Sequence, residues 1–160
     1  MEAAVLKRMA EYFAHDTKRI NHALKVYGFA VLIAGGENLS PKEALTVRIA
    51  AILHDIGIHE AERKHGSSAG KYQEMEGPAI AREILENFSI GDDTRERILY
   101  LIGNHHSYSK IDGMDFQVLV EADFLVNIFE DGMNKETIRK IEKNIFQTNT
   151  GSGILSAMFL

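Results

Sequence analysis

The sequence predicts an all-α protein, a single helical domain of about six to eight helices. Only two of its 160 residues are proline, and good helix-forming residues occur throughout. Apolar residues recur at helical spacing along most of the chain. They make up 45% of the composition against 26% charged residues, which is typical of a globular chain with a sizeable core.

The first two helices are expected over residues 2–14 and 17–34, where apolar side chains repeat every three or four positions. Asp16 can cap the second helix with its carboxylate. Gly35 and Gly36 should end that helix, because glycine adopts the left-handed cap conformation at little cost.

The third helix has the clearest start signal in the chain. Ser40 can cap it, Pro41 suits its first turn, and Glu43 can complete a capping box. The helix is expected to run from residue 41 to 55. It is nearly all apolar from Ile49 onward, so its second half should be buried centrally.

Two polar segments are interpreted as loops. Residues 58–72 read as a long loop with no more than a short helical turn near Glu60, and residues 107–114 as a second loop. A long loop inside a compact domain is often functional. Glycine and serine between residues 66 and 70 would suit a mobile lid.

The remaining helices complete one domain, 1–160. Its core is expected over about residues 19–127, with C-terminal helices in 134–160 packing on it. Asp92 or Asp93 can cap the fifth helix. The helices expected after the first polar loop span residues 77–88, 94–105, 115–129 and 134–146, followed by a short closing helix at 154–160.

Composition excludes several classes of function. The chain has no cysteine, so disulfides, thiolate metal sites and a cysteine nucleophile are ruled out. A net charge of −5 disfavours stable nucleic-acid binding. The longest apolar run, residues 29–34, is too short to cross a membrane, and the N-terminus lacks the basic region of a signal peptide. We therefore expect a cytoplasmic protein with no membrane partner, and homo-oligomerisation stays open.

A histidine–aspartate pair follows the apolar part of the third predicted helix. His54 and Asp55 come directly after the run Ile49–Leu53, and Gly57 follows. Imidazole and carboxylate are common ligands for divalent metals. Taken alone, the dipeptide is explained as simply by a buried, hydrogen-bonded pair.

Two further polar residues lie on apolar helical segments. His22 falls within the second predicted helix and Asp123 in the middle of the sixth. Either could be satisfied by an ordinary hydrogen bond or salt bridge. Together with His54 and Asp55 they offer two nitrogen and two oxygen ligands. This set suits a divalent ion such as manganese, iron, nickel, magnesium or zinc, without selecting one.

The order of these residues resembles the HD-domain superfamily of metal-dependent phosphohydrolases. A histidine, then the stretch Leu53-His54-Asp55-Ile56-Gly57, then a distant aspartate lie in a helical chain. The resemblance covers about residues 19–127. It implies an HD-type helical bundle in which His22, His54, Asp55 and Asp123 are the metal ligands.

Some members of that superfamily bind a second metal. The resemblance implies Glu76 and either His105 or His106 as its ligands here. Members with two metals often have a histidine near Glu76, so this chain departs from the pattern at that position. The sequence after the paired histidines, Ser107-Tyr108, also lacks the Gly-Tyr-Pro signature of the cyclic-dinucleotide phosphodiesterases.

The expected function is hydrolysis of a phosphoester or phosphoanhydride of a small phosphorylated metabolite by a metal-activated water, with a nucleotide as the expected substrate. Asp55 would both ligate the metal and orient the attacking water. Lys64 and Lys71 would bind the phosphate, and His59 or His65 would donate a proton to the leaving oxygen.

Other interpretations of these residues stay open. Lys18, Arg19 and Arg48 are weaker candidates for binding phosphate, and all of these charges could instead be solvated surface groups. One alternative function is an HD-fold di-iron oxygenase, which requires Glu76 or a neighbour and one of the histidines at 105 and 106. Another is a non-catalytic regulatory HD module.

Overall fold

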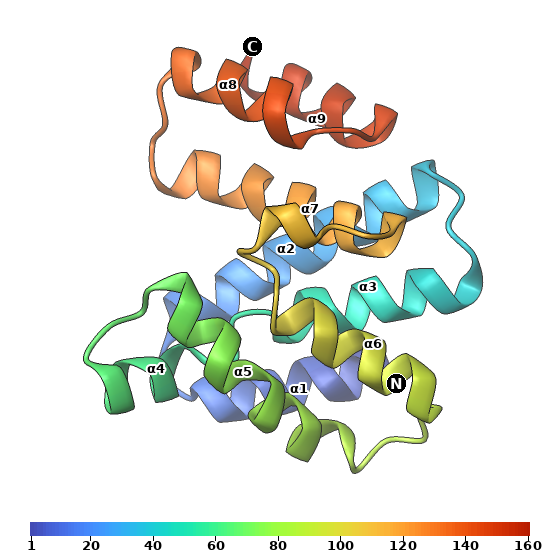
Figure 1. Ribbon diagram of the computed structural model, residues 1–160, viewed down its shortest axis with the longest axis vertical. Coiled ribbons are helices and arrows are strands. Elements are labelled where there is room, and N and C mark those ends of the chain that lie inside the picture. The colour runs from blue at the N-terminus through green and yellow to red at the C-terminus, as the bar shows by residue number, and fades with distance from the viewer.

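The computed structural model describes residues 1–160 and confirms the all-α prediction (Figure 1). It contains nine α-helices, one short 3-10 helix and no strand. No helix is both long enough and apolar enough to cross a membrane. In chain order the elements are α1 (Glu2–Phe13), α2 (Thr17–Gly36), α3 (Pro41–Leu53), α4 (Ile58–His65), α5 (Gly70–Leu85), α6 (Asp92–Ile102), η1 (Tyr108–Lys110), α7 (Met114–Glu130), α8 (Lys135–Ile145) and α9 (Asn149–Phe159).

Helices α2, α3 and α7 form the centre of the bundle. Helix α2 packs against α3 and α7, and α3 also packs against α6 (Figure 1). One continuous cluster of 34 buried apolar residues includes members from all nine helices, so the chain has a single core. The second half of α3, from Ile49 to Leu53, is fully buried as its apolar sequence predicts.

The predicted cap of α3 is present. The Ser40 hydroxyl accepts a hydrogen bond from the Glu43 amide at 3.3 Å, and the Ser40 amide donates to the Glu43 carboxylate at 3.1 Å. The Asp16 carboxylate likewise caps α2 by accepting from the Arg19 amide at 3.2 Å. These short-range signals position two of the three helices on which the candidate site is built.

The predicted end of α2 is two residues too early. Gly35 and Gly36 continue the helix, and the left-handed residue is Asn38, with φ of 54°. Gly36 is needed for another reason, since a Cβ there would clash with the Thr150 side chain. The glycine lets the start of α9 approach the end of α2.

The predicted loop over residues 58–72 is also wrong, because most of it is helical. Helix α4 fills residues 58–65 and ends at Gly66, which has φ of 62°. Helix α5 begins at Gly70, seven residues before the predicted start, and carries Pro78 in its interior. This extra helix is why the structure has nine helices.

Gly57 allows α5 to pack closely on the turn that follows the His-Asp pair. A Cβ at Gly57 would lie 2.5 Å from the Gly77 amide nitrogen and 2.7 Å from the Gln73 carbonyl oxygen. Both are backbone atoms that cannot rotate away, so only glycine fits. The turn carrying the pair is thereby held against α5.

The C-terminal helices α8 and α9 lie together over α7 at one end of the molecule (Figure 1). The connection between them is held by Glu121 of α7, which is fully buried. Its carboxylate accepts hydrogen bonds from the Gln147 and Thr148 amides at 2.6 and 2.9 Å, from the Gln117 amide group at 2.8 Å, and from the Thr148 hydroxyl. Thr148 in turn caps α9, which therefore begins at Asn149 and not at residue 154.

Candidate metal centre

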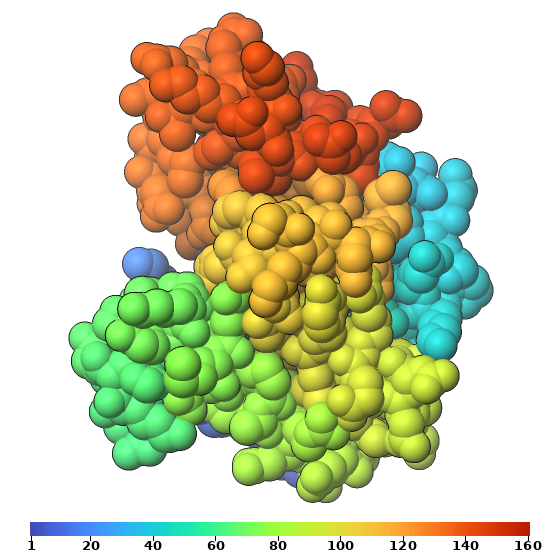
Figure 2. All heavy atoms as spheres, viewed as in Figure 1, coloured from blue at the N-terminus to red at the C-terminus, as the bar shows by residue number.

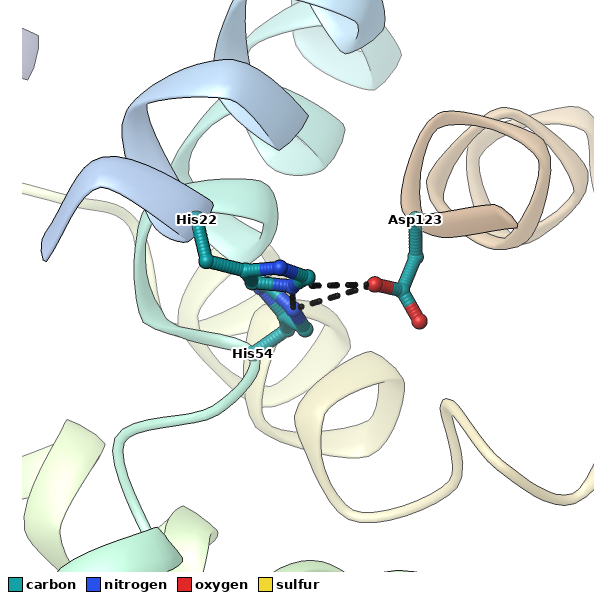
Figure 3. Close-up of side chains that lie close together, drawn as sticks. All are labelled: His22, His54 and Asp123. Carbon is teal, nitrogen blue, oxygen red and sulfur yellow. Dashed lines mark hydrogen bonds and ion pairs between the residues drawn. The ribbon is translucent and has the colours of Figure 1, made fainter. Parts of the chain in front are cut away.

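Three helices bring His22, His54 and Asp123 to one point (Figure 3). His22 comes from α2, His54 follows the last residue of α3, and Asp123 comes from α7. The His22 Nε2 atom lies 3.2 Å from His54 Nε2 and 3.1 Å from Asp123 Oδ1. All three side chains are buried. The sequence-predicted combination is therefore assembled in space.

Asp55 adds a fourth ligand atom to this group. Its Oδ2 lies 3.5 Å from His22 Nε2 and 3.4 Å from His54 Nε2. Ligands about 2.1 Å from an ion lie about 3.0 Å apart in adjacent octahedral positions and about 3.4 Å apart in a tetrahedron. The observed separations therefore have the size of a metal coordination sphere.

Hydrogen bonds from the Nδ1 atoms of the two histidines fix Nε2 as the ring nitrogen that faces the centre. His54 Nδ1 donates to the Ala51 carbonyl at 2.9 Å, and His22 Nδ1 donates to the Glu130 carboxylate at 3.0 Å. In neutral imidazoles this leaves each Nε2 atom without a proton and with a lone pair that points to the centre. Two lone pairs 3.2 Å apart repel unless a cation lies between them. The donor set therefore fits a metal ion.

The electrostatics of the group also favour a positive charge. Burial lowers the pKa of His54, but Asp55 and Asp123 outweigh burial and hold that pKa well above its usual value. The pKa of His22 is raised in the same way by Asp123 and Asp55 against the effect of burial. Burial raises the pKa of Asp123 itself, but His22 and His54 outweigh it and keep the group ionised. The two carboxylates thus attract whichever cation enters.

A second group of potential ligands adjoins the first. His105 Nε2 lies 3.4 Å from Asp55 Oδ1. It is buried and has no hydrogen-bond partner, while His105 Nδ1 donates to the Ile102 carbonyl at 2.8 Å. Asp55, His105 and His106 have ligand atoms within 4.8 Å of one another. Asp55 therefore directs one oxygen to each group, a suitable arrangement for a shared ligand.

The two histidines of this second group do not lie in α6, which ends at Ile102. They occupy the turn that follows, as His54 does after α3. Burial and the neighbouring His105 lower the pKa of His106 to about 4. His106 is therefore neutral near pH 7, which is the form that binds metals.

Glu76 is not part of either group, and its expected role as a second-metal ligand stays a prediction. Its carboxylate accepts from Lys64 Nζ at 2.7 Å and lies 3.0 Å from His65 Nε2. These contacts join the outer surfaces of α4 and α5. Lys64 also lies 3.2 Å from Glu60, so two carboxylates already neutralise it.

The other predicted catalytic residues of this segment also lie elsewhere. The Lys71 ammonium is exposed and sits 4.6 Å from the centre of the Tyr72 ring. His59 Nε2 lies 2.9 Å from Asp16 Oδ2, and its ring packs on Phe13. None of Lys64, Lys71 and His59 lines the cavity beside the first group of ligands or belongs to either group, so their expected contacts with a bound phosphate stay predictions.

A cavity of about 500 Å³ leads to the first group of ligands. His22, Asp55 and Asp123 line it, and Lys18 and Arg19 contribute the cations. In Figure 2 the surface is notched between the green segment that contains α4 and the orange end of α7. The weaker sequence candidates Lys18 and Arg19, and not the lysines of α4 and α5, thus lie beside the centre.

Glu130 was missed by sequence reasoning. It lies at the end of α7 and reads as a surface residue, but it orients the His22 ring and accepts from Lys25 Nζ at 2.6 Å. Carboxylates that hold a metal-binding histidine are worth about 10- to 100-fold in metal affinity. Only the packing of α2 on α7 brings Glu130 to His22, so no local sequence signal could have identified it.

We expect Glu130→Gln to weaken metal binding by about 10- to 100-fold, because an amide is a poorer acceptor for His22 Nδ1–H. Competition of Mn²⁺ or Zn²⁺ binding against a chromogenic chelator measures this directly. Glu136→Gln is the matched control, since Glu136 pairs with Lys140 at 2.8 Å on the exposed face of α8. Equal affinities in the two variants would contradict the positioning role of Glu130.

Comparison with known proteins agrees with the geometry. The HD domain family matches residues 19–147. Searches of curated proteins and of solved structures returned no match. The matched region includes both groups of ligands and extends through α8. The chain therefore belongs to the HD domain family, within the HD-domain superfamily of metal-dependent phosphohydrolases.

Proposed function

We propose that the protein is a metal-dependent phosphohydrolase that cleaves a phosphoester or phosphoanhydride bond of a small phosphorylated metabolite. The observation that carries this proposal is the convergence of four ligand atoms, from His22, His54, Asp55 and Asp123, at the end of an open polar cavity. A nucleotide is the substrate expected from the sequence, so nucleotides belong to the class to be tested.

The chain's own residues supply the charges that this reaction needs. When bound, a divalent ion lowers the pKa of a coordinated water and balances charge on a phosphoryl oxygen. His22, His54, Asp55 and Asp123 would hold it, and manganese, iron, nickel, magnesium and zinc all accept such ligands. Asp55 Oδ2 faces His22 and His54, whereas Oδ1 faces His105, so Oδ1 could accept a hydrogen bond from the attacking water.

Lys18 is the residue best placed to bind the phosphate. It lines the cavity, is exposed and forms no ion pair with a carboxylate of the chain. Arg19 also lines the cavity, but its guanidinium already binds Asp16 and Glu62, each at 2.5 Å. Lys18 can therefore neutralise phosphate oxygens without breaking an existing contact.

The alternative functions are less well supported. The alternative of a di-iron oxygenase requires Glu76 or a neighbour as a ligand, and the Glu76 carboxylate is already engaged by Lys64 and His65. A non-catalytic module has no need for buried ligand atoms that converge on a cavity.

A phosphate-release screen tests the proposal. The compounds are nucleoside mono- and triphosphates and sugar phosphates, each with Mn²⁺, Fe²⁺, Ni²⁺, Mg²⁺ and Zn²⁺. We expect release from at least one compound with at least one ion. The proposal fails if metal-loaded protein, verified by elemental analysis, releases phosphate from none. Two tightly held irons without any phosphate release would support the oxygenase.

A further inference from the structure

We propose that the group attached to the phosphate is a polyhydroxylated one, so that the substrate is a sugar or polyol phosphate and not a nucleotide. This inference rests on the proposed function and concerns the walls of the same cavity. It arises from the side chains that a bound molecule would meet beyond the metal ligands.

The cavity has no surface on which a nucleobase could stack. Of its twelve lining residues only Ile58 is hydrophobic, and the only rings are the imidazoles of His22 and His106. Stacking on an aromatic side chain is a main source of affinity for a base. Cavities that bind flat apolar groups are lined mainly by hydrophobic and aromatic residues. A nucleobase would therefore gain little binding energy in this cavity.

The same cavity has a row of groups suited to hydroxyls along α7. Asp123 and Asn127 are four residues apart on one face of α7, Asp131 directly follows the last residue of that helix, and all three line the cavity. Each step along the row is about 6 Å. Asp123 belongs to the first group of metal ligands, and Asn127 and Asp131 follow it toward the rim of the cavity.

Asn127 and Asp131 are free to bind a ligand. Neither side chain forms a hydrogen bond or an ion pair within the protein, whereas Glu130 beside them is occupied by His22 and Lys25. An amide both donates and accepts, and a carboxylate accepts from two hydroxyls at once. With the phosphate at the metal group, Asn127 would reach the hydroxyls nearest to the phosphate and Asp131 those farther away.

The charge of the rim also favours this class of ligand. A base extending from a bound phosphate would meet the exposed carboxylate of Asp131. Removing water from this carboxylate with an apolar ring is unfavourable. Hydroxyl groups can replace the water that the carboxylate loses.

Matched phosphate-release assays test the inference. We expect kcat/KM for hexose and polyol phosphates to exceed that for nucleoside monophosphates by at least about tenfold, since loss of paired hydroxyls leaves polar groups unsatisfied. Calorimetry with a hexose sulfate and a nucleoside sulfate, which carry no phosphoryl group, should show the same order of binding. Faster cleavage and tighter binding of the nucleoside compounds would overturn the inference but support the proposed function. No cleavage of any compound would overturn the proposed function itself.

A variant pair assigns the effect to α7. Asn127→Ala should lower kcat/KM for the best sugar phosphate by about three- to tenfold, as expected for one hydrogen bond. The loss should be smaller for p-nitrophenyl phosphate, which carries no hydroxyl group. Asn144→Ala, on the exposed face of α8, is the control and should change neither rate. Equal losses for both substrates in Asn127→Ala would contradict a role in recognising hydroxyls.

Discussion

Replacing Asp55 by alanine should abolish phosphate release, with kcat/KM falling by about 10³-fold or more. Asp55 is the one residue whose two oxygens face both groups of ligands, at 3.4 Å from His54 Nε2 on one side and 3.4 Å from His105 Nε2 on the other. Loss of the Asp55 carboxylate therefore removes a ligand atom from both groups at once. Phosphate release and metal content by elemental analysis measure the effect.

Two controls make this result interpretable. Asp55→Asn keeps the shape and one carbonyl oxygen, so it should retain more metal than the alanine variant. Asp93→Ala, at an exposed position of α6, should leave activity unchanged. Thermal unfolding shows whether each variant is folded. A folded Asp55→Ala protein with wild-type activity would disprove the proposed function.

Replacing Glu121 by alanine should lower the free energy of unfolding by about 3–5 kcal/mol, the largest loss of stability that we expect from one truncation. The buried amide and hydroxyl of Thr148 would lose their acceptor, and so would the partly buried amide of Gln147. Each unsatisfied buried donor costs about 1–3 kcal/mol. Urea unfolding at constant m-value measures the change.

The free energy of unfolding of Glu121→Gln should lie between those of the wild-type protein and of Glu121→Ala. The amide keeps one accepting oxygen but presents N–H groups to the donors that surround it. Glu136→Ala is the surface control, since the Glu136 side chain is 80% exposed and a surface ion pair contributes little. A loss below about 1 kcal/mol for Glu121→Ala would contradict the anchoring role assigned to it.

The central ligands could be predicted from sequence because burial makes them conspicuous. His54, Asp55 and Asp123 lie in apolar segments, where a polar side chain needs a partner. Glu121 carried the same signal two residues before Asp123 and was overlooked. Its partners belong to a connection that shows no pattern of its own.

The lysine that we propose to bind the phosphate could not be chosen from sequence. Lys64 and Lys18 are both exposed, and the direction of a long flexible side chain depends on its neighbours. Glu60 and Glu76 draw Lys64 away, and these contacts exist only because α4 is a helix packed on α5. That helix has just two buried residues, Ile58 and Ala61, and no side-chain cap, so its pattern resembles a polar loop.

The wide spacing of the ligands along the chain has a consequence for folding. His22 and Asp123 touch although 101 positions separate them. Contacts between such distant residues form late, because the intervening chain must be ordered before they can be made. An ion held between α2 and α7 would therefore link the N-terminal and C-terminal parts of the chain directly. It would stabilise the native state by about 2.7 kcal/mol when present at one hundred times its dissociation constant.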